Sequence, residues 1–158
     1  LNTTAAYTGS TGVWGNQEPT SSVFFVGNDG DMNQNTKEHV AYCFAPITGF
    51  SSFGTFDGNA NADGPFVYTG FRPAFILLKN QGSGIRSWEV YDSTRDPYNA
   101  AERSLLTNNS VNETTGSERV DFLANGFKIR TSANGINAAT PIYYAAFAEH
   151  PFKFARAR

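Results

Sequence analysis

Short apolar runs separated by Gly, Pro, Asn and Asp fill this chain, and this spacing leaves almost no room for a long helix. Residues 87–92 show the pattern clearly, because they alternate with period two and place Trp88 and Val90 on one face. We expect strands at residues 23–26, 39–45, 64–70, 73–79, 87–92, 119–123, 127–130 and 142–148. The sequence therefore predicts an all-β fold.

Helix signals are confined to residues 99–106, which we expect to form about two helical turns, too few to organise a fold. Eight to ten strands without intervening helices are typical of an antiparallel β-sandwich or jelly roll. Residues 124–126 hold an Asn-Gly turn that favours a hairpin between the two strands beside it.

Composition excludes several other classes of protein. Charged residues make up only 16% of the chain, against about 25% in ordinary soluble domains, whereas aromatic residues make up 15%. The aromatic content is too high for intrinsic disorder, and no apolar run approaches the length of a membrane span. A net charge of −2 gives no broad footprint for nucleic acid. We expect no cofactor, no nucleic-acid binding and no membrane insertion.

A single cysteine, Cys43, rules out a disulfide framework within the chain and a zinc site built on several thiolates. Its apolar neighbours favour a buried free thiol. His39 lies four residues earlier, about 13 Å away along a strand, which is too far for a nucleophile and its base. We therefore expect no cysteine protease, and the second histidine, His150, adds no catalytic pattern.

The chain also contains a partial internal repeat. Residues 40–46 resemble residues 143–149, and matching segments further back keep offsets of about 100 residues. We expect residues 1–50 to be the second half of a β repeat unit and residues 51–158 to be a complete unit that packs with it in one sandwich. A start in the middle of a repeat leads us to expect the C-terminal portion of a longer polypeptide.

Asp92 and Asp96 are the carboxylate pair that a glycan-cleaving enzyme would use, since they follow Trp88 in a loop. The alternative is structural: Asp-Ser-Thr and Asp-Pro are ordinary turn sequences whose carboxylates bind nearby backbone N–H groups, and Arg95 would pair with one of them. We favour the structural interpretation and expect no enzymatic activity.

Two segments place oxygen ligands at alternate positions, as a calcium loop does at its start. The first contains Asp29 and Asp31, and the second contains Asp57 and Asp63. Neither has the closing glutamate, and Val40 stands where the first would need it. We interpret both as surface turns and keep the four aspartates as weak calcium candidates.

Carbohydrate binding would use aromatic rings near loops, with Asn and Asp side chains for the sugar hydroxyls. The candidates are Tyr7, Trp14, Trp88 and Tyr98, with Asp92 and Asp96 beside them. The alternative for Trp14 and Trp88 is burial in a core, the more common fate of tryptophan on an alternating strand. The sequence leaves both interpretations open.

Several blocks together resemble a known family. They are residues 41–45, 49–54, 63–73, 88–92, 120–128 and 143–153. These blocks resemble a domain family found at the C-terminal end of phage virion proteins, many of them from aquatic and marine phages. The resemblance runs from Thr20 to Arg158, and members look like tail fibres or tail appendages with concanavalin-like jelly-roll modules upstream.

The resemblance implies a virion structural protein that contacts the host surface through glycans without cleaving them. It further implies a homo-oligomer, with a trimer favoured, in contact with other virion proteins. Because exposed phenylalanines are unfavourable at a free end, we expect residues 152–158 to dock onto something. The alternative roles are a capsid decoration or lattice-forming protein and, third, a depolymerase of surface polysaccharides.

Overall fold

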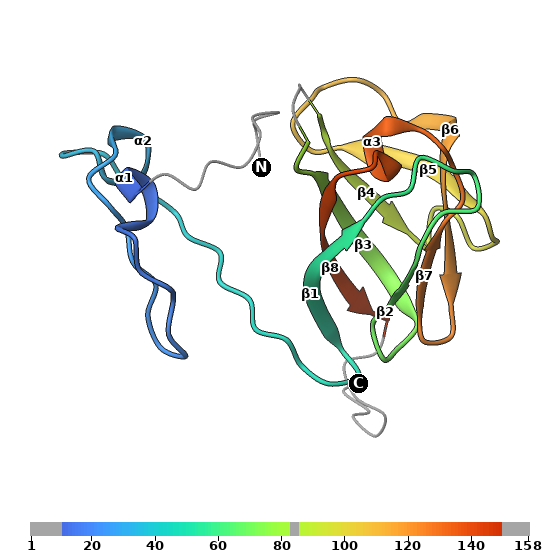
Figure 1. The fold of residues 1–158 in the computed structure, drawn as a ribbon, viewed down its shortest axis with the longest axis horizontal. Coiled ribbons are helices and arrows are strands. Elements are labelled where there is room, and N and C mark those ends of the chain that lie inside the picture. Colours follow the sequence, from blue (N-terminus) through green and yellow to red (C-terminus); the bar gives the residue numbers. More distant parts are fainter. Residues whose placement is uncertain (1–10, 83–85, 150–158) are drawn as a thin grey trace. The chain divides into compact units, whose positions relative to one another are not determined.

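The computed structural model describes residues 11–82 and 86–149 (Figure 1). Within them, residues 11–44 belong to one compact unit and residues 45–149 to a second. Each unit is described by itself. No helix in the described part of the chain is long and apolar enough to cross a membrane.

The first unit holds two helices of four residues, α1 (Thr11–Trp14) and α2 (Gly30–Asn33), and is otherwise irregular. The backbone N–H of Gly27 donates to the carbonyl of Val13 at 2.7 Å and so ties one loop to α1. The strands predicted at residues 23–26 and 39–45 are wrong, because both segments have apolar side chains but no partner strand here. The prediction that Cys43 is buried is also wrong, since Cys43 is exposed.

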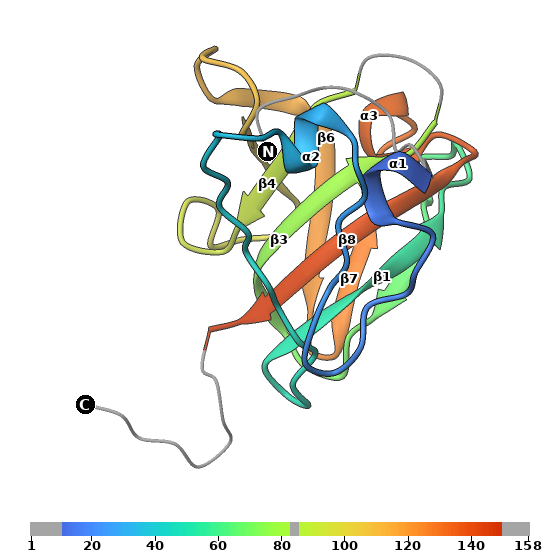
Figure 2. The ribbon, with the colours of Figure 1, turned by 90° about the vertical axis from the view of Figure 1, so that its left-hand side faces the viewer.

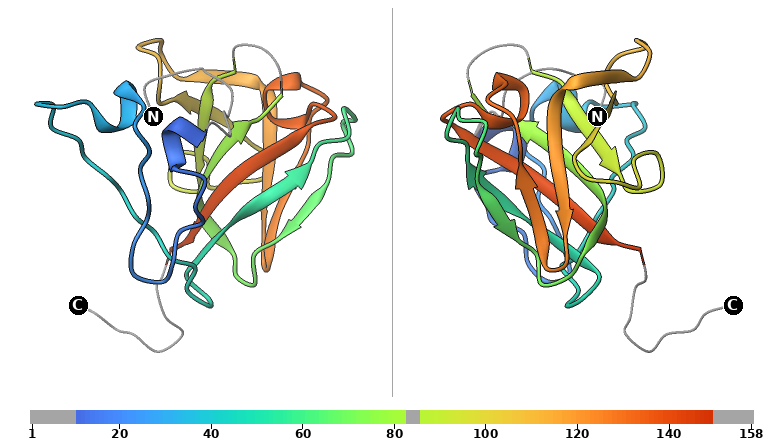
Figure 3. Two further views of the ribbon diagram at one scale, coloured as in Figure 1. Left: turned by 60° about the vertical axis from the view of Figure 1, so that its left-hand side comes forward. Right: turned by 90° about the vertical axis from the view of Figure 1, so that its right-hand side faces the viewer.

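The second unit is one antiparallel sheet of eight strands, which confirms the all-β class. The strands are β1 (Ser51–Asp57), β2 (Phe66–Tyr68), β3 (Pro73–Asn80), β4 (Trp88–Asp92), β5 (Ala101–Leu106), β6 (Thr114–Leu123), β7 (Gly126–Ile129) and β8 (Pro141–Ala148). Their order is β1-β8-β3-β4-β5-β6-β7-β2. Figure 3 shows β1 beside β8 in one view and the β6–β7 hairpin in the other. The sheet curls and nearly closes into a barrel. The antiparallel all-β part of the prediction is therefore confirmed, but the strands do not form two clearly separate sheets, as a sandwich would require.

The predicted hairpin at residues 124–126 is confirmed, with Phe122 opposite Phe127. The predicted helix at residues 99–106 is wrong, because residues 101–106 form β5. There Ala101 pairs with Val120 of β6, and its side chain is fully buried. Tertiary pairing thus overrides the helix propensity of this Ala- and Leu-containing segment.

The interior of the curled sheet holds the hydrophobic core. Its buried members are Val67, Phe71, Ile76, Leu78, Tyr91, Ala101, Val120, Phe122, Phe127, Ile129, Ile136, Ile142 and Ala146. Phe56 of β1 lies edge-on to Phe127 of β7, with ring centroids 5.9 Å apart, and Tyr144 of β8 lies 5.6 Å from Phe127. These contacts join strands at opposite ends of the sheet order, which is why the sheet nearly closes.

A short helix, α3 (Asn134–Asn137), contributes to the core of this unit. It buries Ile136 and Asn137, at 1% and 0% exposure. Asn137 binds the loop after β1, and Gly58 in that loop passes so close that an added Cβ would lie 1.9 Å from the carbonyl oxygen of Ala138. Only glycine fits at this position.

Candidate functional site

Strands β1, β8, β3 and β4 are neighbours in the sheet (Figure 2). They carry a set of aromatic side chains on the side that faces away from the core. Side chains alternate along a strand, so the even-numbered residues of β4 and the odd-numbered residues of the other three share this side. Leu77 illustrates the register, because it lies between Val90 of β4 and Ala145 of β8. We call the following side chains the aromatic face: Phe53, Phe75, Leu77, Lys79, Trp88, Val90, Tyr143, Ala145 and Phe147.

Phe147 is the centre of the phenylalanine part of this face. Its ring centroid lies 5.5 Å from that of Phe53, 6.0 Å from that of Phe75 and 6.1 Å from that of Phe50, each in an edge-on arrangement. Such pairs contribute roughly 0.5–1.5 kcal/mol each beyond the burial of apolar area. Three strands are therefore held together on their outer side by rings.

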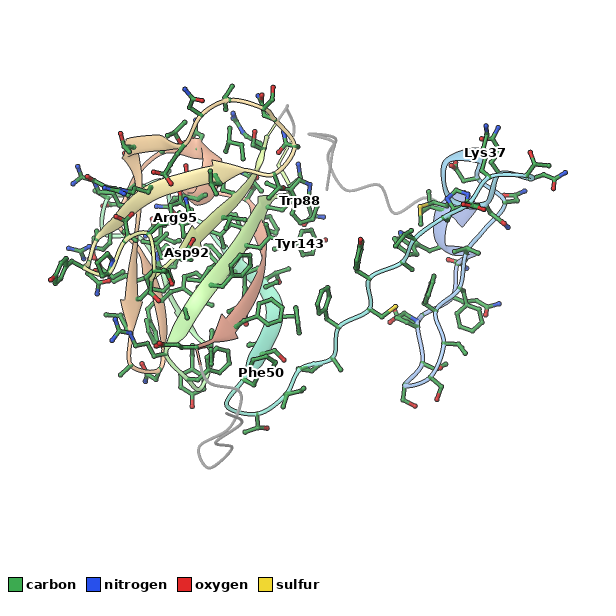
Figure 4. The ribbon with its side chains drawn as sticks, turned by 180° about the vertical axis from the view of Figure 1, so that it is seen from behind. Lys37, Phe50, Trp88, Asp92, Arg95 and Tyr143 are labelled. Atoms are coloured by element: carbon green, nitrogen blue, oxygen red, sulfur yellow. The ribbon has the colours of Figure 1, made fainter. Side chains whose placement is uncertain are left out.

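Trp88 and Tyr143 form the second part of the face, on either side of Lys79 in the register. The Lys79 Nζ lies 5.7 Å from the centroid of the Trp88 ring and donates a hydrogen bond to the Arg86 carbonyl at 2.7 Å. Burial lowers the pKa of Lys79. Figure 4 shows Trp88 and Tyr143 close together on the barrel. This end of the face combines a cation with two rings that carry polar atoms.

Trp88 is partly buried, so neither earlier interpretation, loop aromatic or core residue, describes it completely. Its backbone N–H donates to Asn108 Oδ1 at 2.8 Å, which fixes the start of β4. Its indole Nε1 is buried without a hydrogen-bond partner. A buried unpaired N–H is costly, and an acceptor that reached it would be bound favourably.

Asp92, at the end of β4, is held by Arg95 (Figure 4). Its Oδ1 accepts the backbone N–H groups of Thr94 at 3.0 Å and Arg95 at 2.8 Å, and its Oδ2 accepts from Arg95 Nε. Partial burial acts to raise the pKa of Asp92, but these hydrogen bonds and the guanidinium charge outweigh it, and the pKa is lowered. Arg95 also binds Glu113 at 2.7 Å and the Val90 carbonyl at 3.1 Å.

Asp96 fixes the next part of the same loop. Its Oδ2 accepts the backbone N–H groups of Glu102 at 2.9 Å and Arg103 at 2.7 Å. Asn99 exchanges two hydrogen bonds with the backbone of Phe122, at 2.9 and 3.0 Å. Between these two anchors Tyr98 is 84% exposed. The loop is therefore held at both sides of an exposed aromatic residue.

The remaining candidates lie elsewhere. Trp14 belongs to the first unit and is 40% exposed, whereas Tyr7 and His150 lie outside the described residues. Trp88 and Asp92 share one side of β4, and Tyr98 follows on the next loop. The structure thus brings Asp92, Asp96 and Tyr98 together at the end of β4, whereas Trp88 lies at the other end of this strand.

The calcium candidates lie in two separate segments of the chain. Asp29 and Asp31 are in the first unit, whereas Asp57 and Asp63 are in the second. Asp63 pairs with Lys128 at 2.8 Å, and this hydrogen bond and charge lower its pKa. Across the described residues, no three His, Cys, Asp or Glu side chains are grouped closely enough to hold a metal ion. In the segment after Asp57, Asn59 Oδ1 and Asn61 Oδ1 each accept the backbone N–H two residues on, which is a turn arrangement.

The phenylalanine cluster around Phe147 was not among the residues singled out from the sequence. The neighbouring residues of β8 are apolar on both sides of the strand, so the sequence does not say which side faces the core. A signal was nevertheless present, because Tyr143 and Phe147 lie at alternate positions with Ala145 between them.

Comparison with known proteins gives one match. A protein family described as a domain of unknown function, DUF7483, matches residues 1–151. No curated protein and no solved structure matches the chain.

Proposed function

We propose a non-catalytic binding role for this chain, which belongs to the family of domains described as DUF7483. In this proposal it is a structural protein of a phage virion, a tail-fibre or tail-appendage domain that contacts glycans on the host surface. The phage context comes from the resemblance of the sequence, and the binding role comes from the aromatic face.

The aromatic face is the observation that carries the binding role. Sugars present flat C–H surfaces that pack against aromatic rings, and they present hydroxyls that bind to charged and amide groups. Trp88 and Tyr143 supply rings beside the Lys79 cation, and Tyr98 supplies an exposed ring on an anchored loop. Rings held by strands and hydrogen bonds lose little conformational entropy on binding, which favours affinity.

The carboxylates support a non-catalytic role. A general acid needs a raised pKa near neutral pH, whereas the pKa of Asp92 is lowered by its contacts with Arg95. Asp96 is occupied by two backbone N–H groups. Both residues therefore serve as loop anchors in this proposal, and a depolymerase is the third candidate.

The second candidate is an assembly protein, such as a capsid decoration or lattice-forming subunit. The phenylalanine cluster favours it, because rings such as Phe75, which is 36% exposed, can be buried by another protein. In either case we propose that the chain is located in the virion, associates with copies of itself and contacts other virion proteins.

Binding of the chain to an array of bacterial surface glycans, with adsorption to host cells, separates these roles. We expect binding that falls at least tenfold in Tyr98→Ala and in Trp88→Ala. Tyr68→Ala is the matched control, since Tyr68 is 66% exposed on β2 at the other end of the sheet order. Absence of glycan binding by the parent chain contradicts the proposal and favours assembly.

Release of reducing ends from host polysaccharide would instead favour the depolymerase. Loss of that release in Asp92→Asn or Asp96→Asn would locate the reaction at this loop, provided that circular dichroism shows both variants to be folded.

A further inference from the structure

β1 (Ser51–Asp57) forms one edge of the sheet. It pairs with β8 on one side, and on the other side Ser51 forms an antiparallel bridge with Ile47. The two residues of this bridge exchange both backbone hydrogen bonds, at 3.0 and 2.9 Å. Because backbone groups alternate along a strand, Thr55 and Asp57 direct their N–H and C=O toward this same edge. Among the described residues no strand pairs with Thr55 or Asp57 at this edge, which leaves these two positions able to pair with another strand.

Residues 39–43 have the sequence of a strand, but no strand in the described part of the chain pairs with them. Val40, Tyr42 and Phe44 are 78%, 83% and 66% exposed, and the residues between them are small. The described hydrogen bonds include none from the backbone of residues 39–43. A segment in which exposed apolar side chains alternate with small ones can pair with the edge strand of a sheet, and the pairing buries its apolar side chains.

The register of the Ile47–Ser51 bridge shows how the segment and the edge fit each other. If antiparallel pairing continued from this bridge, Cys43 would lie opposite Thr55 and Tyr42 would lie opposite Phe56. Phe56 faces the interior, where it packs against Phe127. The large side chains of the segment would then fall on the interior side, and its small residues would fall on the outer side.

Within one chain, the antiparallel pairing does not continue beyond the Ile47–Ser51 bridge. In a continued ladder the Ala45 carbonyl would accept a hydrogen bond from the backbone of β1, but here it accepts the Ser51 hydroxyl at 3.0 Å. Ser51 Oγ also accepts the Ile47 N–H at 3.1 Å. The serine side chain thus takes the place of the next rung of the ladder.

We propose that residues 40–44 of a second copy of this chain pair with β1 in the register that the bridge sets. Such an exchange of identical strands is a low-cost route to a closed oligomer. This pairing rests on the self-association in the proposed function and gives it a defined surface. The test of the pairing needs no glycan, so the pairing and the glycan binding can fail independently.

The native cysteine makes the test direct. Opposed residues in a hydrogen-bonded antiparallel pair have Cα atoms about 5.5 Å apart, which lies within the range for a disulfide. Thr55→Cys therefore places a second thiol opposite Cys43, the one cysteine of the chain. On mild oxidation of the full chain we expect covalent oligomers in which peptide mapping finds Cys43 joined to the introduced thiol.

Two controls accompany this variant. The parent chain measures background linkage between two copies of Cys43, and Thr94→Cys places a thiol on an exposed loop beyond β4. We expect cross-linking of Thr55→Cys to exceed both at least tenfold, and Tyr42→Asp in the Thr55→Cys background to abolish it. A monomer with an internal disulfide, linkage through Cys43 alone, or no linkage would each overturn the proposal.

Discussion

Asn137 and Asn59 are joined by two hydrogen bonds although 78 residues separate them in the sequence. The Asn137 Nδ2 donates to Asn59 Oδ1 at 3.0 Å, and the Asn59 backbone N–H donates to Asn137 Oδ1 at 2.9 Å. Asn137 Nδ2 also lies within hydrogen-bond distance of the carbonyls of Asn61 and Thr131. One fully buried amide thus links α3 to the loop after β1.

We predict that Asn137→Ala lowers the free energy of unfolding by about 3 kcal/mol, because it leaves several buried polar groups without partners. Urea denaturation measures the change. Asn112→Ala, at an exposed position, is the control and is expected to change stability by less than about 0.5 kcal/mol. Equal effects of the two variants would show that the amide network is not a determinant of stability.

Asp92 predicts a dependence of stability on pH. Its pKa in the folded protein lies below the ordinary value of 3.8, so its contribution is present above pH 4 and is lost as the pH falls through the folded pKa. Asp92→Asn should therefore destabilise the domain at pH 7 by about 1.5 kcal/mol and by much less near pH 2.

Thermal unfolding between pH 2 and pH 7 tests this dependence. Asp57→Asn, at an exposed position on β1, is the control. A destabilisation by Asp92→Asn that stayed constant over this range would mean that the charge of Asp92 contributes nothing.

We predict that Phe147 contributes to the stability of the domain through its ring contacts on the aromatic face. Phe147→Ala removes three edge-on ring contacts and should lower the free energy of unfolding by about 2–3 kcal/mol. Phe66→Ala, on the edge strand β2 where the ring is 46% exposed, should cost about 1 kcal/mol or less. Chemical denaturation of both variants gives the comparison, and a larger loss in Phe66→Ala would be contrary to it.

We predict that position 58 tolerates no side chain larger than that of glycine. Gly58→Ala would bring a Cβ to 1.9 Å from the Ala138 carbonyl oxygen, so backbone must move, and we expect a loss of about 3 kcal/mol or more. At Gly30 an added Cβ meets nothing within 4 Å, and Gly30→Ala should be near neutral. Melting temperatures of the two variants are the measurement, and a Gly58→Ala protein as stable as its parent would refute this packing.

Much of the second unit is predictable from the sequence, because its strands are apolar runs bounded by turn residues. Residues 73–79, 88–92 and 142–148 are strands as expected. β1 was not predicted, since its Ser, Gly and Thr residues lower its apolar content, and pairing with β8 stabilises it instead. Residues 23–26 show the converse, an apolar run that is not a strand because no partner strand pairs with it.

The candidate site was predictable only in part. Asp92, Asp96 and Tyr98 are close in the sequence, and so their grouping follows from one loop, whereas Trp88 lies at the opposite end of β4. The joining of Trp88 and Tyr143 across Lys79 depends on the order β8-β3-β4, which local patterns do not contain. The half-repeat and its boundary at residue 50 remain predictions.

Nuclear magnetic resonance of the two tryptophan indole N–H groups tests the central claim most directly, because the chain has one tryptophan in each unit. The chain would be titrated with the glycan that it binds best on the array. We predict that the Trp88 signal shifts in a saturable way and that the Trp14 signal stays in place. A saturable shift of Trp14 with an unchanged Trp88 would contradict binding at the aromatic face.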